Sequence, residues 1–185
     1  KQGVNMSVIA QAGAKGRQLH KFGGSSLADA KCYLRVAGIM TEYSQAGDMM
    51  VVSAAGSTTN QLISWLKLSQ TDRLSAHQVQ QSLRRYQMEL ISGLLSPDAA
   101  DTLIAIFIQD LERLAGLLDG GVTDAVYAEV VGHGEVWSAR LMAAVLNHLG
   151  VEAAWLDARS FLRAERSPQP QVDEGLSYPL LQQLM

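Results

Sequence analysis

The sequence has 185 residues, 48% of them hydrophobic, with fifteen Lys and Arg against eighteen Asp and Glu. This length and hydrophobic content are typical of a globular domain with a core, and a net charge of −3 excludes a strongly basic nucleic-acid-binding surface. No apolar run approaches the roughly 18–20 residues that span a bilayer, and the N-terminus lacks the layout of a signal peptide. We therefore expect neither a nucleic-acid partner nor a membrane partner.

Two further features bear on compartment and boundaries. Cys32 is the single cysteine, so no internal disulfide can form and a reducing, cytoplasmic location is expected. Met6 follows five residues that resemble an addition ahead of a natural start. We therefore predict that residues 1–5 carry no function and that residues 6–185 form one domain portion.

Short apolar runs and helical patterns alternate in the first part of the chain. Their expected bounds are residues 17–22 for a strand, 30–46 for a helix, 49–54 for a strand buried on both faces, and 58–68 for a helix. Thr58, Thr59 or Asn60 is the expected N-cap of the second of these helices. This alternation predicts an α/β architecture with parallel strands and right-handed crossovers.

The rest of the chain is mostly helical in its period. Residues 75–150 are expected to form helices, with a start at Ser96-Pro97, an end at Gly120-Gly121 and a helix pair over 123–149. The later segments expected are a strand at residues 152–158, a loop at 167–171 and a helix that starts at Ser177 with Pro179 in its first turn. Because that last helix would stop after two turns on apolar residues, we expect a longer polypeptide.

Two glycine-rich corners follow the expected strands, residues 23–26 (the first corner) and residues 53–58 (the second corner). Ligands of parallel α/β sheets bind beyond the carboxyl ends of the strands, where both corners lie. In the first corner, Gly23 and Gly24 allow close backbone approach, and Ser25 and Ser26 can cap the following helix. With Lys21 these groups would suit a phosphate, although a plain turn beside a surface lysine is the alternative.

The second corner is built from small and hydroxyl-bearing residues. Ser53, Ala54 and their neighbours leave room for a ligand above the strand end, and the following helix offers a positive N-terminus. The alternative is a capped helix start in which small residues only allow close packing.

A third stretch, "GHGE" at residues 132–135, places two glycines around a histidine. We expect these glycines to set Glu135 on the first turn of an apolar helix. His133 and Glu135 lack the i, i+4 spacing of a helical zinc pair, so His133 is interpreted as structural. Asp157, at the end of the expected third strand, could approach the site, but a structural role is favoured.

Three motifs in this order, "KFGGSS", "VVSAAGSTTN" and "GHGEVWSARL", resemble those of the aspartokinases of the amino-acid-kinase family. Residues 17–185 are similar to the N-terminal part of the kinase domain, most of all in the bifunctional branch fused to a homoserine dehydrogenase. The resemblance implies a three-layer α/β sandwich with a mainly parallel sheet and a helix-rich middle. Only the portion before the nucleotide-binding half would be present here.

The resemblance also implies an activity, ATP-dependent phosphorylation of the aspartate β-carboxylate to 4-phospho-L-aspartate. This is a step toward lysine, threonine and methionine. Lys21 would stabilise the transferred phosphoryl group, and no protein group would bind a metal, because Mg²⁺ would be held through the ATP phosphates. The implied phosphate-binding residues are Lys21, Gly23, Gly24, Ser26, Ser53 and Ala54, and the implied aspartate-binding residues are Ser53, Thr59 and Glu135.

Later kinase motifs of the family are absent from these 185 residues, as is the GxGxxG fingerprint of a dehydrogenase half. We therefore expect the enzyme to be the longer polypeptide and this chain alone to be inactive. Its expected partners are ATP, L-aspartate, the rest of that polypeptide and further copies in a homo-oligomer. Two alternatives stay open: a non-catalytic self-association module formed by residues 75–149, and another kinase of the same family.

Overall fold

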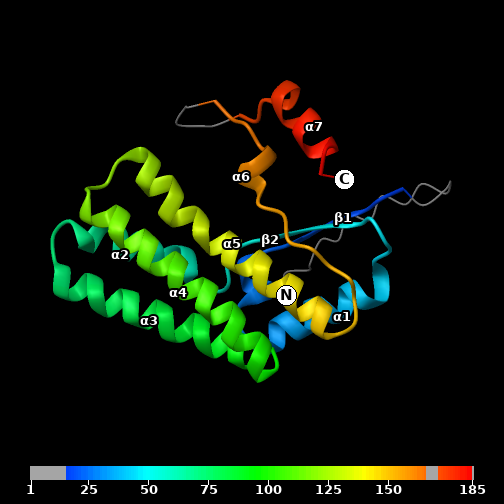
Figure 1. Cartoon of the computed structure of the whole chain (residues 1–185), viewed down its shortest axis with the longest axis horizontal. Helices are drawn as coiled ribbons and strands as arrows, with labels where there is room; N and C mark the ends of the chain where they lie inside the picture. The colour runs from blue at the N-terminus through cyan, green and yellow to red at the C-terminus, as the bar shows by residue number, and fades with distance from the viewer. Residues whose placement is uncertain (1–15, 166–170, 185) are drawn as a thin grey trace, which may run out of the picture.

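The structure, a computed structural model, describes residues 16–165 and 171–184, so most of the loop expected at 167–171 lies outside the described residues. The elements in chain order are β1 (Leu19–Phe22), the short 3₁₀ helix η1 (Gly24–Leu27), α1 (Ala30–Tyr43), β2 (Met49–Val52), α2 (Thr58–Ser69), α3 (Arg73–Ser92), α4 (Pro97–Asp119), α5 (Asp124–His148), α6 (Ala158–Phe161) and α7 (Glu174–Gln182). Helix α5 is the centre of the arrangement. The bundle of α2, α3 and α4 packs on one side of it, and α1 and β2 also contact it (Figure 1).

The two strands form a parallel pair, as the alternation of elements predicts. Leu19 lies opposite Met49 and Phe22 opposite Val52, and α1 makes the crossover between the strands. One face of the pair packs on the core through Phe22 and Val52. On the opposite face Val51 of β2 is 46% exposed, so the expectation that the strand at residues 49–54 is buried on both faces is wrong.

The helix pair expected over residues 123–149 is wrong, because α5 is one continuous helix of 25 residues. Gly132 and Gly134 lie inside it, since a glycine weakens a helix by only about 1 kcal/mol relative to alanine. Buried residues before and after the two glycines compensate that loss, because Val130 and Val145 are fully buried in the core.

Helix starts differ from the sequence predictions at three places. Asp29 caps α1, with its Oδ1 accepting the Cys32 N–H at 2.8 Å, while Ser25 and Ser26 lie inside η1. Ser57 precedes α2 without a side-chain cap bond, so the expected cap at Thr58, Thr59 or Asn60 is wrong. Helix α7 starts earlier than expected. Asp173 caps it, and Pro179 lies inside the helix.

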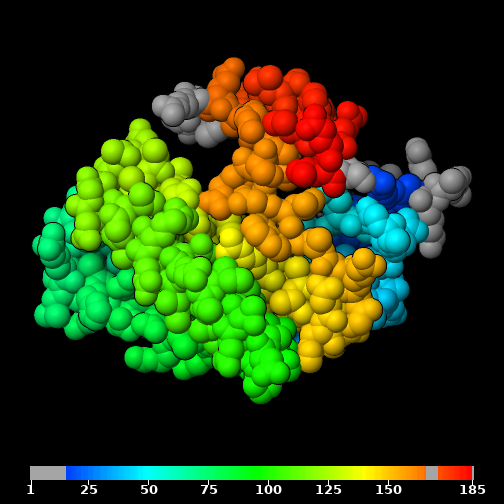
Figure 2. Space-filling view, viewed as in Figure 1, coloured from blue at the N-terminus to red at the C-terminus, as the bar shows by residue number. Residues whose placement is uncertain are grey.

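The strand expected at residues 152–158 is not formed. The backbone of Ala153 bonds instead to the side chain of Asn147 on α5: Nδ2 donates to the Ala153 carbonyl at 2.7 Å and Oδ1 accepts the Ala153 N–H at 3.3 Å. Because these backbone groups bond to the Asn147 side-chain amide, the apolar run follows α5 without joining the sheet, and it lies on the molecular surface (Figure 2).

None of the described helices is long and apolar enough to cross a membrane.

Candidate functional site

The first corner lies directly beyond β1. Lys21 is exposed, and its Nζ lies 3.8 Å from the point that a Cβ on Gly23 would occupy. The chain then turns into η1, where the Ser26 N–H donates to the Gly23 carbonyl at 3.0 Å. The first N–H groups of a helix have no acceptor within it, so a positive side chain and free donors lie close together.

The N-terminus of α1 does not add to this positive region as expected. The Cys32 N–H bonds to Asp29, and this contact holds the pKa of the Asp29 carboxyl below its usual value. A negative carboxylate therefore offsets the helix dipole where Ser25 and Ser26 were expected to act as caps. An anion at this corner would depend on Lys21 and on the donors of the turn.

The two corners touch through their backbones. The Gly56 N–H donates to the Gly24 carbonyl at 3.2 Å, and a Cβ on Gly24 would lie 2.8 Å from the Ala54 carbonyl oxygen. Gly56 has a φ of +51°, in the left-handed region that favours glycine. Gly24 and Gly56 are therefore required for this close approach.

Helix α5 brings the third motif to the second corner. A Cβ on Gly134 would lie 2.7 Å from the Ala54 Cβ and 3.3 Å from the Thr58 Cγ2, so the helix can approach only because residue 134 is glycine. Glu135, expected on a first helical turn, lies instead near the middle of α5. Its Oε1 accepts the Ala54 N–H at 3.4 Å, a long hydrogen bond that places the carboxylate beside the second corner.

The remaining predicted site residues surround this junction. Ser53 is half-buried, and its N–H continues the strand pairing to the Phe22 carbonyl at 3.0 Å. Thr59 is half-buried in the first turn of α2, and within the described part of the chain no hydrogen bond joins its hydroxyl to Glu135. Glu135 itself is exposed. The structure thus brings both corners and Glu135 together and leaves Thr59 without a direct link to that carboxylate.

Several contributing residues could not be recognised from the sequence. Tyr86 on α3 donates its hydroxyl to the Ala28 carbonyl at 3.0 Å, and the neighbouring Gln87 donates Nε2 to the Thr58 hydroxyl at 2.8 Å. Tyr86 lies on an apolar stripe of helical spacing, and that spacing signals burial but not the partner of its hydroxyl.

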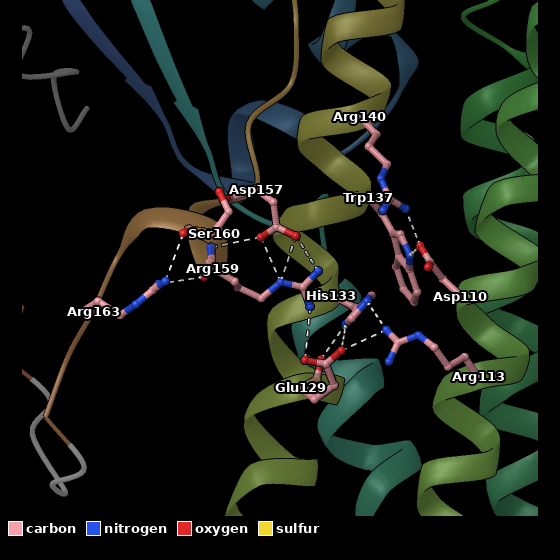
Figure 3. Close-up of polar contacts among 10 residues, drawn as sticks. All are labelled: Asp110, Arg113, Glu129, His133, Trp137, Arg140, Asp157, Arg159, Ser160 and Arg163. Carbon is pink, nitrogen blue, oxygen red and sulfur yellow. Dashed lines mark hydrogen bonds and ion pairs between the residues drawn. The ribbon is translucent and has the colours of Figure 1, made fainter. Parts of the chain in front are cut away.

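The opposite face of α5 carries a polar network centred on Glu129 (Figure 3). Its carboxylate pairs with Arg113 of α4 at 2.9 Å and with Arg159 of α6 at 3.2 Å. His133 is buried beside it: Nδ1 donates to the Glu129 carbonyl at 2.6 Å and Nε2 accepts from Arg113 at 2.7 Å. Asp157 caps α6 and pairs with Arg159 at 2.7 Å, which holds the pKa of its carboxyl below the usual value. These contacts account for His133 and Asp157 as structural residues.

Burial lowers the pKa of His133 from its ordinary value near 6.5. The unfolded chain therefore binds a proton more readily than the folded chain, and folding stability falls as the pH drops below 6.5. Between pH 7 and pH 5 the free energy of unfolding should decrease, by up to about 1.4 kcal/mol per pH unit below 6.5. Urea unfolding of wild type and His133→Gln at several pH values checks this, with exposed His148→Gln as control. The same pH dependence of the free energy of unfolding in wild type and His133→Gln would contradict this prediction.

The chain is similar to proteins of a known family. The profile of the amino acid kinase family matches residues 16–185. The chain belongs to this family. It is 83% identical over 180 residues to the bifunctional aspartokinase/homoserine dehydrogenase 2 of Escherichia coli K12, covering 97% of this chain and 22% of that protein. It is also 28% identical to the lysine-sensitive aspartokinase 3 of E. coli K12, covering 77% of this chain and 31% of that one.

Solved structures agree with this assignment. The fold matches E. coli aspartokinase III in complex with aspartate and ADP, with a TM-score of 0.81 at 24% identity over 92% of this chain and 38% of the other. The lysine- and aspartate-bound form of the same enzyme matches with a TM-score of 0.79 at 25% identity, over 91% of this chain and 38% of the other. The resemblance to aspartokinases and the amino-acid-kinase-like α/β fold are therefore confirmed. Because stand-alone aspartokinases match as well, the chain corresponds to the aspartokinase part of the bifunctional relative.

Proposed function

We propose that this chain supplies the phosphate-binding and aspartate-binding corners of an aspartokinase whose complete polypeptide is longer. The observation that carries the proposal is the junction itself. The Lys21 Nζ lies beside Gly23 of the first corner, and the first corner contacts the second corner through its backbone. Glu135 of α5 accepts a hydrogen bond from the second corner. The related E. coli aspartokinase III, of which the chain covers 38%, has been solved with aspartate and ADP.

The reaction is phosphoryl transfer to a carboxylate. A β-carboxylate oxygen of aspartate bonds to the γ-phosphorus of ATP, the bond from that phosphorus to the bridging oxygen breaks, and ADP leaves with the electron pair. Such transfer depends on positioning and charge neutralisation more than on covalent chemistry of the protein. Lys21 is suited to neutralise charge on the transferred group.

The other residues take roles that fit their places. Gly23, Gly24 and Ser26 present the turn to the phosphates, and Ser53 and Ala54 line the point where the two substrates meet. Glu135, an exposed carboxylate, suits the α-ammonium group of aspartate, and Thr59 lies in the first turn of the adjacent helix. The described residues contain no cluster of three or more His, Cys, Asp or Glu that could hold a metal ion. Mg²⁺ would arrive bound to the phosphates of ATP.

The setting of this activity is part of the proposal. Residues 6–185 would form the N-terminal portion of the kinase domain, and residues that follow in the longer polypeptide would complete the nucleotide pocket. The chain spans 22% of the bifunctional relative's length, so a homoserine dehydrogenase activity, homo-oligomer formation and a cytoplasmic location are assigned only to that longer polypeptide.

Calorimetric titration of the chain with ATP-Mg²⁺ and, separately, with aspartate tests the proposal. Lys21→Ala is expected to weaken ATP-Mg²⁺ binding about tenfold, the effect of losing one charged hydrogen bond. Aspartate binding should change little in the same variant. Lys67→Ala, at an exposed lysine in the last turn of α2, is the matched control and should bind like wild type. Equal ATP-Mg²⁺ affinity in wild type and Lys21→Ala would refute the proposal. Binding of neither ligand by a folded wild-type chain would mean that the residues that follow in the longer polypeptide are indispensable.

A further inference from the structure

The junction of the two corners is held from outside by α3, a helix that carries none of the predicted site residues. Tyr86 reaches the segment just after the first corner, where its hydroxyl donates to the carbonyl of Ala28, the residue that follows η1, at 3.0 Å. The same oxygen would lie only 2.7 Å from a Cβ on Gly56, so it is packed against the second corner as well. One hydroxyl therefore contacts the second corner and the end of the η1 turn that contains the first corner.

The next residue of α3 holds the second corner in a different way. Gln87 is 3% exposed, and its Nε2 donates at 2.8 Å to the hydroxyl of Thr58, which is fully buried. Thr58 begins α2 and is followed by Thr59. Two consecutive residues of one helix thus fix the position of the first corner, the second corner and the start of α2.

Direct contact between the corners is made by their backbones alone. One backbone hydrogen bond, from Gly56 to Gly24 at 3.2 Å, joins them. Glycine backbones have the largest conformational freedom, so a pair of glycine corners needs external constraints to keep one geometry. We propose that Tyr86 is a positioning residue for phosphoryl transfer, which sets the distance between the phosphate corner and the aspartate corner through its hydroxyl.

This inference rests on the proposed kinase function. Positioning of this kind matters because reacting atoms must come within about 3–3.5 Å, and a misplacement of about 1 Å can cost about 100-fold in rate. Burial also raises the pKa of Tyr86 above its usual value, so the hydroxyl keeps its proton and remains a donor at neutral pH. The contacts of the Tyr86 hydroxyl are with Ala28 and Gly56, so the proposed role is exerted through the backbone of these loops.

Tyr86→Phe removes the hydroxyl and keeps the ring. ATP-Mg²⁺ binding to the 185-residue chain should weaken about threefold to tenfold, which corresponds to one net hydrogen bond. Amide hydrogen exchange over residues 23–28 should become faster in the same variant. The matched control is Tyr33→Phe, which removes a buried tyrosine hydrogen bond to Ser138 of α5 that involves neither corner. That variant should lose stability and keep the affinity of wild type.

The outcomes separate this inference from the proposed function. If wild type binds ATP-Mg²⁺ through Lys21 and Tyr86→Phe binds equally well, the positioning role of Tyr86 is refuted and the kinase assignment stands. A lower unfolding temperature with unchanged affinity and unchanged exchange at residues 23–28 would also refute it, because that result describes a purely structural hydroxyl. If Lys21→Ala binds ATP-Mg²⁺ as tightly as wild type, the proposed function fails and this inference fails with it.

Discussion

Replacing Trp137 with alanine is expected to lower the free energy of unfolding by about 3–5 kcal/mol, the cost of emptying a buried aromatic site. Trp137 is 5% exposed and packs edge-to-face on Phe107, with ring centroids 4.9 Å apart. Its indole N–H donates to Asp110 Oδ2 at 3.1 Å, and this carboxylate also accepts from Arg140. The substitution would therefore leave a cavity between α4 and α5 and remove a donor from a half-buried carboxylate.

Urea unfolding followed by circular dichroism measures this loss, because the fluorescence signal would change with the tryptophan itself. Trp155→Ala is the matched control. Trp155 is 38% exposed and lies under the Arg140 guanidinium, 4.5 Å from the ring centroid. Loss of that contact should cost about 0.5–1 kcal/mol. Equal losses at positions 137 and 155 would contradict the burial of Trp137 between α4 and α5.

Alanine at Gly134 is expected to destabilise the protein by about 1–3 kcal/mol, the range of overpacking in a filled core. The new methyl group would lie 2.7 Å from the Ala54 Cβ, so either α5 or the second corner must move. Because Ala54 also donates its N–H to Glu135, movement of the corner should weaken ligand binding as well.

Gly132 supplies a control on the same helix. A Cβ there would meet nothing within 4 Å, so Gly132→Ala should stabilise the chain by about 0.5–1 kcal/mol through helix propensity alone. Thermal unfolding of both variants measures the two changes in stability, which should have opposite signs. Stabilisation by both substitutions would mean that α5 does not approach the second corner as closely as the structure has it.

The contrast between these two glycines shows where sequence reasoning succeeds and where it stops. The strand, corner and helix from β1 to α1 were predictable because apolar periodicity changes abruptly at Gly23 and Gly24. In "GHGE" the same residue type has a different cause. Gly134 is required by a contact with a residue 80 positions earlier in the chain, and local composition cannot distinguish that from a helix end.

The missing third strand has a similar explanation. Residues 152–158 have the composition of a strand, but a strand exists only where a neighbour accepts its backbone hydrogen bonds. Here Asn147 bonds to Ala153 instead. In the site, Lys21 and the glycines were identifiable by type and spacing. Tyr86 and Gln87 were not, because their importance comes from the packing of α3 and not from a local pattern.

The partners at the corners are far apart in the sequence, and this has a consequence for synthesis of the protein. Ala54 bonds to a residue 81 positions later. Helices α2, α3 and α4, in contrast, pack on sequence neighbours and can form as soon as they emerge from the ribosome. The glycine corners are made early but must wait for α5 to be translated. A nascent chain stalled before Glu135 would hold a helical bundle without the proposed ligand site.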